Sequence, residues 1–187
     1  MVITPPQSNF DHKNAHCGWC GVRFAEQKTY PRKCFRCGND TYINPLPVTV
    51  AMLPVVIPDS SAQINRVGLL LQQRNIEPKK GYWALPGGYL DIGETWQEGM
   101  SREVREETGI VIDPTRLKLF CVDLATNNNL LIFGLYEDQL KWEDINFIPN
   151  EESTAIKVLT KPEELAFPTH TKAFTDWYNL PGPWKRL

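Results

Sequence analysis

Gly88-Tyr-Leu-Asp-Ile-Gly-Glu-Thr-Trp-Gln-Glu-Gly-Met-Ser-Arg-Glu-Val-Arg-Glu-Glu-Thr-Gly-Ile110 is the stretch of sequence that decides the fold. Thr95 and Glu98 form the Thr-x-x-Glu capping box that begins a helix. Gly109 is the residue type expected just after a helix ends. The stretch therefore predicts a helix over residues 96–108, which we call the acidic helix.

Three glutamates, which we call the helix acids, crowd the last two turns of this helix: Glu103, Glu106 and Glu107. They repel one another and also meet the negative end of the helix dipole, and each effect costs about a few tenths of a kcal/mol. A divalent cation would reverse both effects, and carboxylates suit Mg²⁺ or Mn²⁺ completed by substrate phosphates. The crowding predicts a metal site for displacement at phosphorus. The alternative is a solvated face laced with Arg102 and Arg105.

Gly99 lies in the same arc of the helix as the acids. Alanine there would make a better helix by about 1 kcal/mol. We therefore expect something to approach the backbone closely at Gly99, and the simpler interpretation is a small residue packed under a loop.

The spacing of the whole stretch is more specific than its acids alone. Gly88, Glu94, Arg102-Glu103-Val104, Glu106-Glu107 and Gly109-Ile110 stand at every fixed position of the Nudix box. The chain thus resembles the Nudix hydrolases. The resemblance implies an α/β fold, an α/β/α sandwich with a mixed sheet, in which the box forms a loop, a helix and a second loop. It also implies hydrolysis of a nucleoside diphosphate linked to another moiety.

The resemblance assigns roles to single residues of the box. The helix acids would be the catalytic metal ligands, assisted by a backbone carbonyl at Gly87 or Gly88, and Gly88 would also contact substrate. Glu94 would pair with Arg102 and brace the loop against the helix. Arg74 ends a predicted strand and is placed to contact phosphate, with a surface salt bridge as the alternative.

Two further roles depend on residues outside the box. A general base could come from Glu151 or Glu152, which are otherwise two exposed loop acids. An aromatic platform for the base could come from Trp83, Tyr89 or Phe133, each of which could instead be a core residue.

Composition agrees with a compact enzyme. The chain has 187 residues, of which 42% are hydrophobic and 22% charged, and its net charge of −2 gives no bulk attraction to nucleic acid or anionic membrane. It has no run long enough to span a bilayer and no signal-peptide core. We expect a cytoplasmic protein that acts on a small nucleotide and binds neither membrane nor nucleic acid. The resemblance allows a homodimer, because dimers are common in the family.

Four of the five cysteines form two Cys-x2-Cys knuckles, Cys17/Cys20 and Cys34/Cys37, each followed by a glycine. In a reducing compartment this spacing predicts a structural Zn²⁺ site, a zinc ribbon closed to substrate. Two disulfides, the alternative, would require secretion. Cys121 stands alone in an apolar stretch and is expected in the core.

Two domains follow, a zinc ribbon over residues 1–44 and a Nudix domain over residues 45–187, separated by a proline-rich junction. The remaining patterns predict strands over 48–56, 66–73, 82–85, 117–125, 130–136 and 156–159 and a helix over 169–178. A polar turn over 58–65 and an asparagine-rich turn over 126–129 would close two hairpins.

The substrate is the least determined part of the prediction. Arg74-Asn75-Ile76, Trp83-Ala-Leu85-Pro86 and Leu165-Ala166-Phe167 are similar to plant-type FAD and ADP-ribose pyrophosphatases, which implies cleavage of either compound with release of AMP. NADH pyrophosphatases also carry a zinc ribbon, but their Ser-Gln-Pro-Trp array is absent. That activity, RNA decapping and removal of damaged nucleotides stay open.

A non-catalytic nucleotide or nucleic-acid binding module is the alternative from another class of function. Its basic surface on the ribbon would be formed by Lys28, Arg32, Lys33 and Arg36. Because every acid of the box is present, we favour the enzyme.

Overall fold

The structure, a computed structural model, describes residues 14–24, 30–58 and 65–181. The chain divides into two compact units, Met1–Pro45 and Leu46–Leu187. Lys28 and residues 59–64 of the predicted polar turn lie outside the described residues. Neither of the helices in the described part is long and apolar enough to cross a bilayer.

The first unit is built from two knuckles and a short hairpin of β1 (Arg32–Lys33) and β2 (Asp40–Thr41). Gly21 and Gly38, which follow the knuckles, have φ angles of 70° and 75°. This left-handed conformation is strained for other residues, so both glycines permit the tight turns that follow the knuckles.

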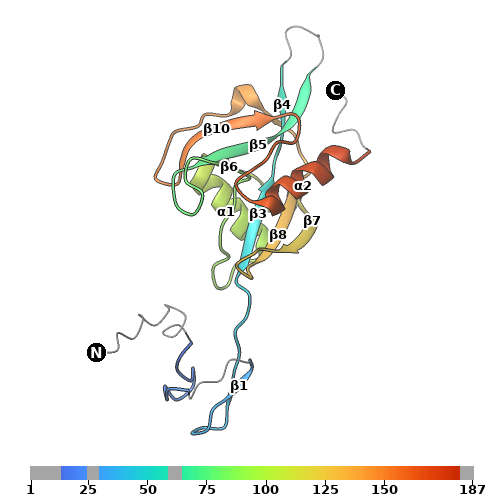
Figure 1. The fold of residues 1–187 in the computed structure, drawn as a ribbon. Coiled ribbons are helices and arrows are strands. Elements are labelled where there is room, and N and C mark those ends of the chain that lie inside the picture. The colour runs from blue at the N-terminus through green and yellow to red at the C-terminus, as the bar shows by residue number, and fades with distance from the viewer. Residues whose placement is uncertain (1–13, 25–29, 59–64, 182–187) are drawn as a thin grey trace, which may run out of the picture. The chain divides into compact units, whose positions relative to one another are not determined.

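In the second unit, two sheets lie between two helices (Figure 1). Among the described residues the first sheet has the order β10-β5-β4-β9, with β6 paired to β5, and the second has the order β3-β8-β7. The strands are β3 (Pro47–Met52), β4 (Pro54–Ile57), β5 (Arg66–Arg74), β6 (Trp83–Ala84), β7 (Leu117–Leu124), β8 (Leu130–Tyr136), β9 (Leu140–Lys141) and β10 (Ser153–Leu159). The helices are α1 (Trp96–Thr108) and α2 (Pro168–Asn179), with short 3₁₀ turns η2 (Pro114–Arg116) and η3 (Trp142–Asp144).

The single strand predicted over 48–56 is wrong, because the chain changes sheets at Leu53. β3 pairs in parallel with β8, whereas β4 pairs antiparallel with β5. The carbonyl of Leu53 accepts the N–H of Leu70, and Pro54 has no N–H with which to continue the first ladder. The β7/β8 hairpin around residues 126–129 is confirmed.

Alternation along the strands builds two cores, one under each helix. On β5, Leu69 and Leu71 belong to the core that includes Phe174 and Trp177 of α2. Leu70, between them, joins the core that includes Met100 and Val104 of α1. The predicted α/β/α arrangement is thus confirmed. Cys121 is only half-buried, but it packs against the core under α2, as expected.

α1 has the bounds predicted for the acidic helix. The Thr95 hydroxyl accepts the N–H of Glu98, whose carboxylate accepts the N–H of Thr95 at 2.8 Å. Gly109 ends the helix with φ 74°. Gly99 lies under the side chains of Leu90 and Glu94 from the loop before the helix, so the simpler interpretation, a small residue under a loop, is correct.

His170, on α2, is enclosed in the core between Phe133 and Phe167. Its Nδ1 accepts the backbone N–H of Leu85 at 3.3 Å. Burial, with a smaller contribution from the charge of Arg74, lowers the pKa of His170 to about 3. The ring is therefore neutral wherever the protein is folded near neutral pH.

Substitution of Gly99 by alanine should destabilise the protein, although alanine favours an isolated helix by about 1 kcal/mol. The added methyl group would collide with Leu90 and Glu94, which would have to move away from the helix. Arg105→Ala, at an exposed position of the same helix, is the matched control. Urea unfolding should give a lower midpoint for Gly99→Ala than for wild type, and an equal or higher midpoint would contradict this packing.

Acid should weaken the fold through His170. Its folded pKa lies below the unfolded value of about 6.5, so between pH 6.5 and about 3 the unfolded chain binds the proton and the folded chain does not. Stability is then lost as the pH falls, by about 1.4 kcal/mol per pH unit at most from this group. In His170→Gln, the slope of unfolding free energy against pH over this window should be smaller, and an unchanged slope would contradict the assignment.

Candidate functional site

The helix acids differ sharply in their surroundings. Glu107 is buried, with 3% of its surface exposed. The side chain of Glu103 is 12% exposed and that of Glu106 is 49% exposed. The three carboxylates therefore run from the interior of the second unit out to solvent along one side of α1.

Glu107 is held between a loop and the end of a strand. Its Oε2 accepts the N–H of Gly87 at 2.7 Å, and its carboxylate is hydrogen-bonded to the side chain of Gln72 on β5. The Ser153 hydroxyl donates to Oε1 of Gln72, which leaves the Gln72 amide NH₂ to face Glu107. Burial raises the pKa of Glu107 to about 8 despite these hydrogen bonds.

The position of the Glu103 carboxylate depends on the absence of a side chain at Gly88. A Cβ built at Gly88 would collide with the Glu103 carboxylate, so the glycine lets the loop approach the helix. Burial raises the pKa of Glu103, although Arg102 works against it. The charges of Glu106 and Glu152 raise it as well.

Arg102 connects the loop before α1 to the helix acids. It makes a two-pronged ion pair with Glu94, with Nη2 to Oε1 at 2.6 Å and Nε to Oε2 at 3.2 Å. Its Nη1 donates to Glu103 at 2.7 Å and to Glu106 at 3.2 Å, and Nη2 also donates to the carbonyl of Tyr89. The Arg102 hydrogen bond lowers the pKa of Glu94. One guanidinium thus fixes the loop and two of the acids.

Glu152 precedes β10, and its charge acts on the same acids. Its side chain is exposed, and its negative charge raises the pKa of both Glu103 and Glu107. Glu152 is therefore the candidate acid from outside the helix.

The predicted substrate contacts are not all gathered at the acids. The Nε of Arg74 donates to the carbonyl of Pro78 at 3.0 Å, and its guanidinium lies 5.3 Å from the centre of the Phe167 ring. Phe133 is fully buried, so its prediction as a platform is wrong and its core role is confirmed. Tyr89 is 53% exposed, and Trp83 lies under the ammonium group of Lys157 at 4.6 Å.

The four knuckle cysteines of the first unit converge. Their sulfur atoms all lie within 4.8 Å of one another, and Cys17 and Cys37 are 3.7 Å apart. All five cysteines are free thiols, so the disulfide alternative does not hold. The N–H of Cys37 donates to Cys34 and lowers the pKa of that thiol.

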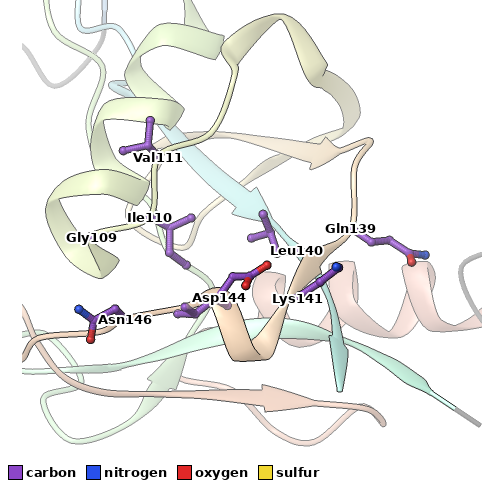
Figure 2. Close-up of a pocket in the computed structure, with 9 residues that line it drawn as sticks. Gly109, Ile110, Val111, Gln139, Leu140, Lys141, Asp144 and Asn146 are labelled. Atoms are coloured by element: carbon purple, nitrogen blue, oxygen red, sulfur yellow. The ribbon is translucent and has the colours of Figure 1, made fainter. Parts of the chain in front are cut away.

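A separate cavity of about 560 Å³ opens beyond the end of α1 (Figure 2). Ile110 and Val111 reach it from the segment after the helix, and Lys141 and Asp144 reach it from β9 and η3. None of the helix acids lines it, so this cavity is not the site described above.

Sequence reasoning missed Gln72 and Asn150, two polar residues that support the acids. Gln72 follows three leucines in a strand, and a polar residue ending a buried run is a signal that could have been used. Asn150 follows a proline and is typical of a turn, which gave no reason to place it at the helix.

Comparisons with known proteins agree with this geometry. A family model described as NUDIX domain matches residues 50–179. A protein named NAD-capped RNA hydrolase NudC from Haemophilus influenzae is 29% identical over 113 residues, which make up 58% of this chain and 39% of that protein. A protein named ADP-ribose pyrophosphatase from Methanocaldococcus jannaschii is 41% identical over 58 residues, 31% of this chain and 34% of that one.

The fold has a counterpart among solved structures. A NUDIX hydrolase from Nitrosomonas europaea aligns with a TM-score of 0.64 at 24% identity, over 87% of this chain and 89% of that chain. The chain spans about two fifths of the length of the Haemophilus relatives that it matches. Because the family model covers most of the chain and contains the whole acidic helix with its loops, the chain belongs to the Nudix family.

Proposed function

We propose that the second unit is a Mg²⁺-dependent pyrophosphohydrolase that cleaves ADP-ribose or FAD at the bond between the two phosphates and releases AMP. The observation that carries the proposal is the gathering of Glu103, Glu106 and Glu107 beside the Gly87–Gly88 loop, where the charge of Glu152 also acts. Mn²⁺ has the same ligand preference.

The donor set fits a hard divalent cation. The helix acids offer carboxylate oxygens, and burial raises the pKa of Glu103 and Glu107, so a bound cation would stabilise their charged forms. The Gly88 carbonyl accepts the N–H of Thr49 at 2.8 Å, so we assign the assisting carbonyl to Gly87. When bound, Mg²⁺ would neutralise phosphate charge and acidify a water molecule.

The other steps of the reaction would be carried out by residues of the chain. Glu152 receives the proton as the water oxygen bonds to one phosphorus. The anhydride P–O bond breaks, and its electron pair leaves with the other phosphate. Arg102 and Glu94 keep the loop on the helix, and Tyr89 or Trp83 offers an aromatic face to the base.

The ADP-ribose assignment is supported by the name of the Methanocaldococcus relative. The Haemophilus relatives carry another name, NAD-capped RNA hydrolase, and this favours NADH or NAD-capped RNA as a second candidate substrate. The same bond between two phosphates would be cleaved in either case. Exposed Lys33 and Arg36 of the first unit would offer positive charge to an RNA chain.

Turnover should require Mg²⁺ or Mn²⁺. In a panel of ADP-ribose, FAD, NADH, NAD-capped RNA and nucleoside triphosphates, it should be greatest with ADP-ribose or FAD. Glu106→Gln keeps the shape of a metal ligand but removes its charge, so kcat should fall by about a hundredfold or more. Glu143→Gln, at an exposed acid of η3, is the control. Product analysis by chromatography would reject the proposal if wild type cleaves none of these compounds, or if Glu106→Gln is as active as wild type.

The four cysteines fit a structural Zn²⁺ ion. A tetrahedral ion with Zn–S bonds of about 2.3 Å separates its sulfurs by about 3.8 Å. The Cys17–Cys37 and Cys20–Cys34 sulfur distances are 3.7 and 3.6 Å, close to that value. Four thiolates leave no open position for substrate, so the role would be to hold the two knuckles together.

Metal analysis of the purified protein should give one zinc ion per chain, and Cys37→Ser should lose it. Without zinc the knuckles lack their main connection, so limited proteolysis should cut within residues 14–45 before residues 65–181. Cys121→Ser, outside the cluster, should keep the zinc. A wild-type protein free of zinc after expression in zinc-supplemented medium would contradict the assignment.

A further inference from the structure

Asn150 connects the end of the acidic helix with the loop that carries Glu152. Its Nδ2 donates to the carbonyl oxygens of Glu106 and Glu107 at 3.0 and 3.2 Å. Its Oδ1 accepts the N–H groups of Glu152 and Ser153 at 2.9 and 2.8 Å. One amide side chain thus satisfies two carbonyls of the helix and two N–H groups of the loop.

These carbonyls are groups that the helix cannot satisfy by itself. The last four carbonyls of an α-helix have no partner within it. In α1 the carbonyl of Arg105 accepts the N–H of Gly109, while those of Glu106 and Glu107 are served by Asn150, which lies more than forty residues away in the chain. The side chain therefore caps the helix from a different segment.

The loop has a second support in Asn75, at the end of β5. The backbone N–H of Asn75 donates to the carbonyl of Glu152 at 2.7 Å, and its side chain donates to the carbonyl of Asn150 at 3.4 Å. Asn75 ties the loop to the first sheet, and Asn150 ties it to the helix. Glu152 is close enough that its charge acts on Glu103 and Glu107.

We propose that Asn150 is a positioning residue, which holds the Glu152 loop against the end of the acidic helix so that Glu152 stays beside the helix acids. The inference rests on the proposed function, because it assumes that Glu152 takes part in the reaction. A displacement of about 1 Å in such a group can cost about a hundredfold in rate. The alternative is a merely structural role, in which Asn150 only stabilises the turn before β10.

Two substitutions separate these roles. Asn150→Ala removes every side-chain hydrogen bond of the residue, whereas Asn150→Asp keeps an acceptor for the two loop N–H groups but cannot donate to the helix carbonyls. Both variants should lower kcat by about tenfold or more and leave KM nearly unchanged. Asn150→Asp should regain only part of the melting temperature lost in Asn150→Ala, because its carboxylate keeps the loop hydrogen bonds but is repelled by the helix carbonyls. Asn146→Ala, at an exposed position of the same segment, should behave like wild type.

The proposal would be overturned if Asn150→Asp recovers kcat together with melting temperature. It would also be overturned if the changes in kcat and KM of the variants simply follow their melting temperatures. A double-mutant cycle gives a second test. If Asn150 acts through Glu152, Asn150→Ala should lower kcat much less in a Glu152→Gln background than in wild type. Equal losses in both backgrounds, or full activity of Glu152→Gln, would contradict it.

Metal binding separates this proposal from the function on which it rests. Glu152 adds negative charge beside the helix acids, so its displacement in Asn150→Ala should weaken Mn²⁺ binding, followed by electron paramagnetic resonance, by about tenfold. If wild type binds Mn²⁺ but cleaves no substrate tested, the proposed function fails while this comparison still decides the role of Asn150. Equal Mn²⁺ affinity in wild type and Asn150→Ala would overturn the positioning role.

Discussion

The second unit depends on one guanidinium, that of Arg102, which holds its negative charges in place. Arg102 contacts Glu94, Glu103 and Glu106 at 2.6, 2.7 and 3.2 Å. The side chains of Arg102, Glu94 and Glu103 are 12 to 23% exposed, so water screens these pairs less than ordinary surface ion pairs. Without Arg102, the acids would repel one another at the negative end of the helix dipole, and the loop would lose its main connection to α1.

Clearance matters as much as charge in this arrangement. The loop can close on α1 only because Gly88 and Gly99 lack side chains at the two places where it approaches the helix. At Gly88 the space is filled by the Glu103 carboxylate, and at Gly99 by Leu90 and Glu94. Close packing at the two glycines brings the loop backbone to the acids. The ion pairs of Arg102, including the one with Glu94, keep it there.

The features that could be predicted from the sequence are those determined by residues close together in the chain. The bounds of α1 follow from a capping box and a terminal glycine within the stretch itself, and the β7/β8 hairpin follows from its asparagine turn. The break at Leu53 could not be read from an apolar run, because both strands are buried and only the partner strands differ. Asn150 was missed for a similar reason, since its bonds to Glu106 and Glu107 exist only after the chain has folded.

The charge balance of the site argues that folding and metal binding are linked through Glu107. Arg102 forms ion pairs with Glu94, Glu103 and Glu106. Within the described part of the chain, the hydrogen bonds of the Glu107 carboxylate come instead from Gln72 and the Gly87 N–H. With a pKa of about 8, this carboxyl is mostly protonated at neutral pH when no cation is present. A metal ligand must be deprotonated, so occupation of the site would release this proton, and the cation would stabilise the buried carboxylate that results. Burial disfavours the charged form of Glu107, and for the same reason a bound cation would be needed to keep this carboxylate ionised.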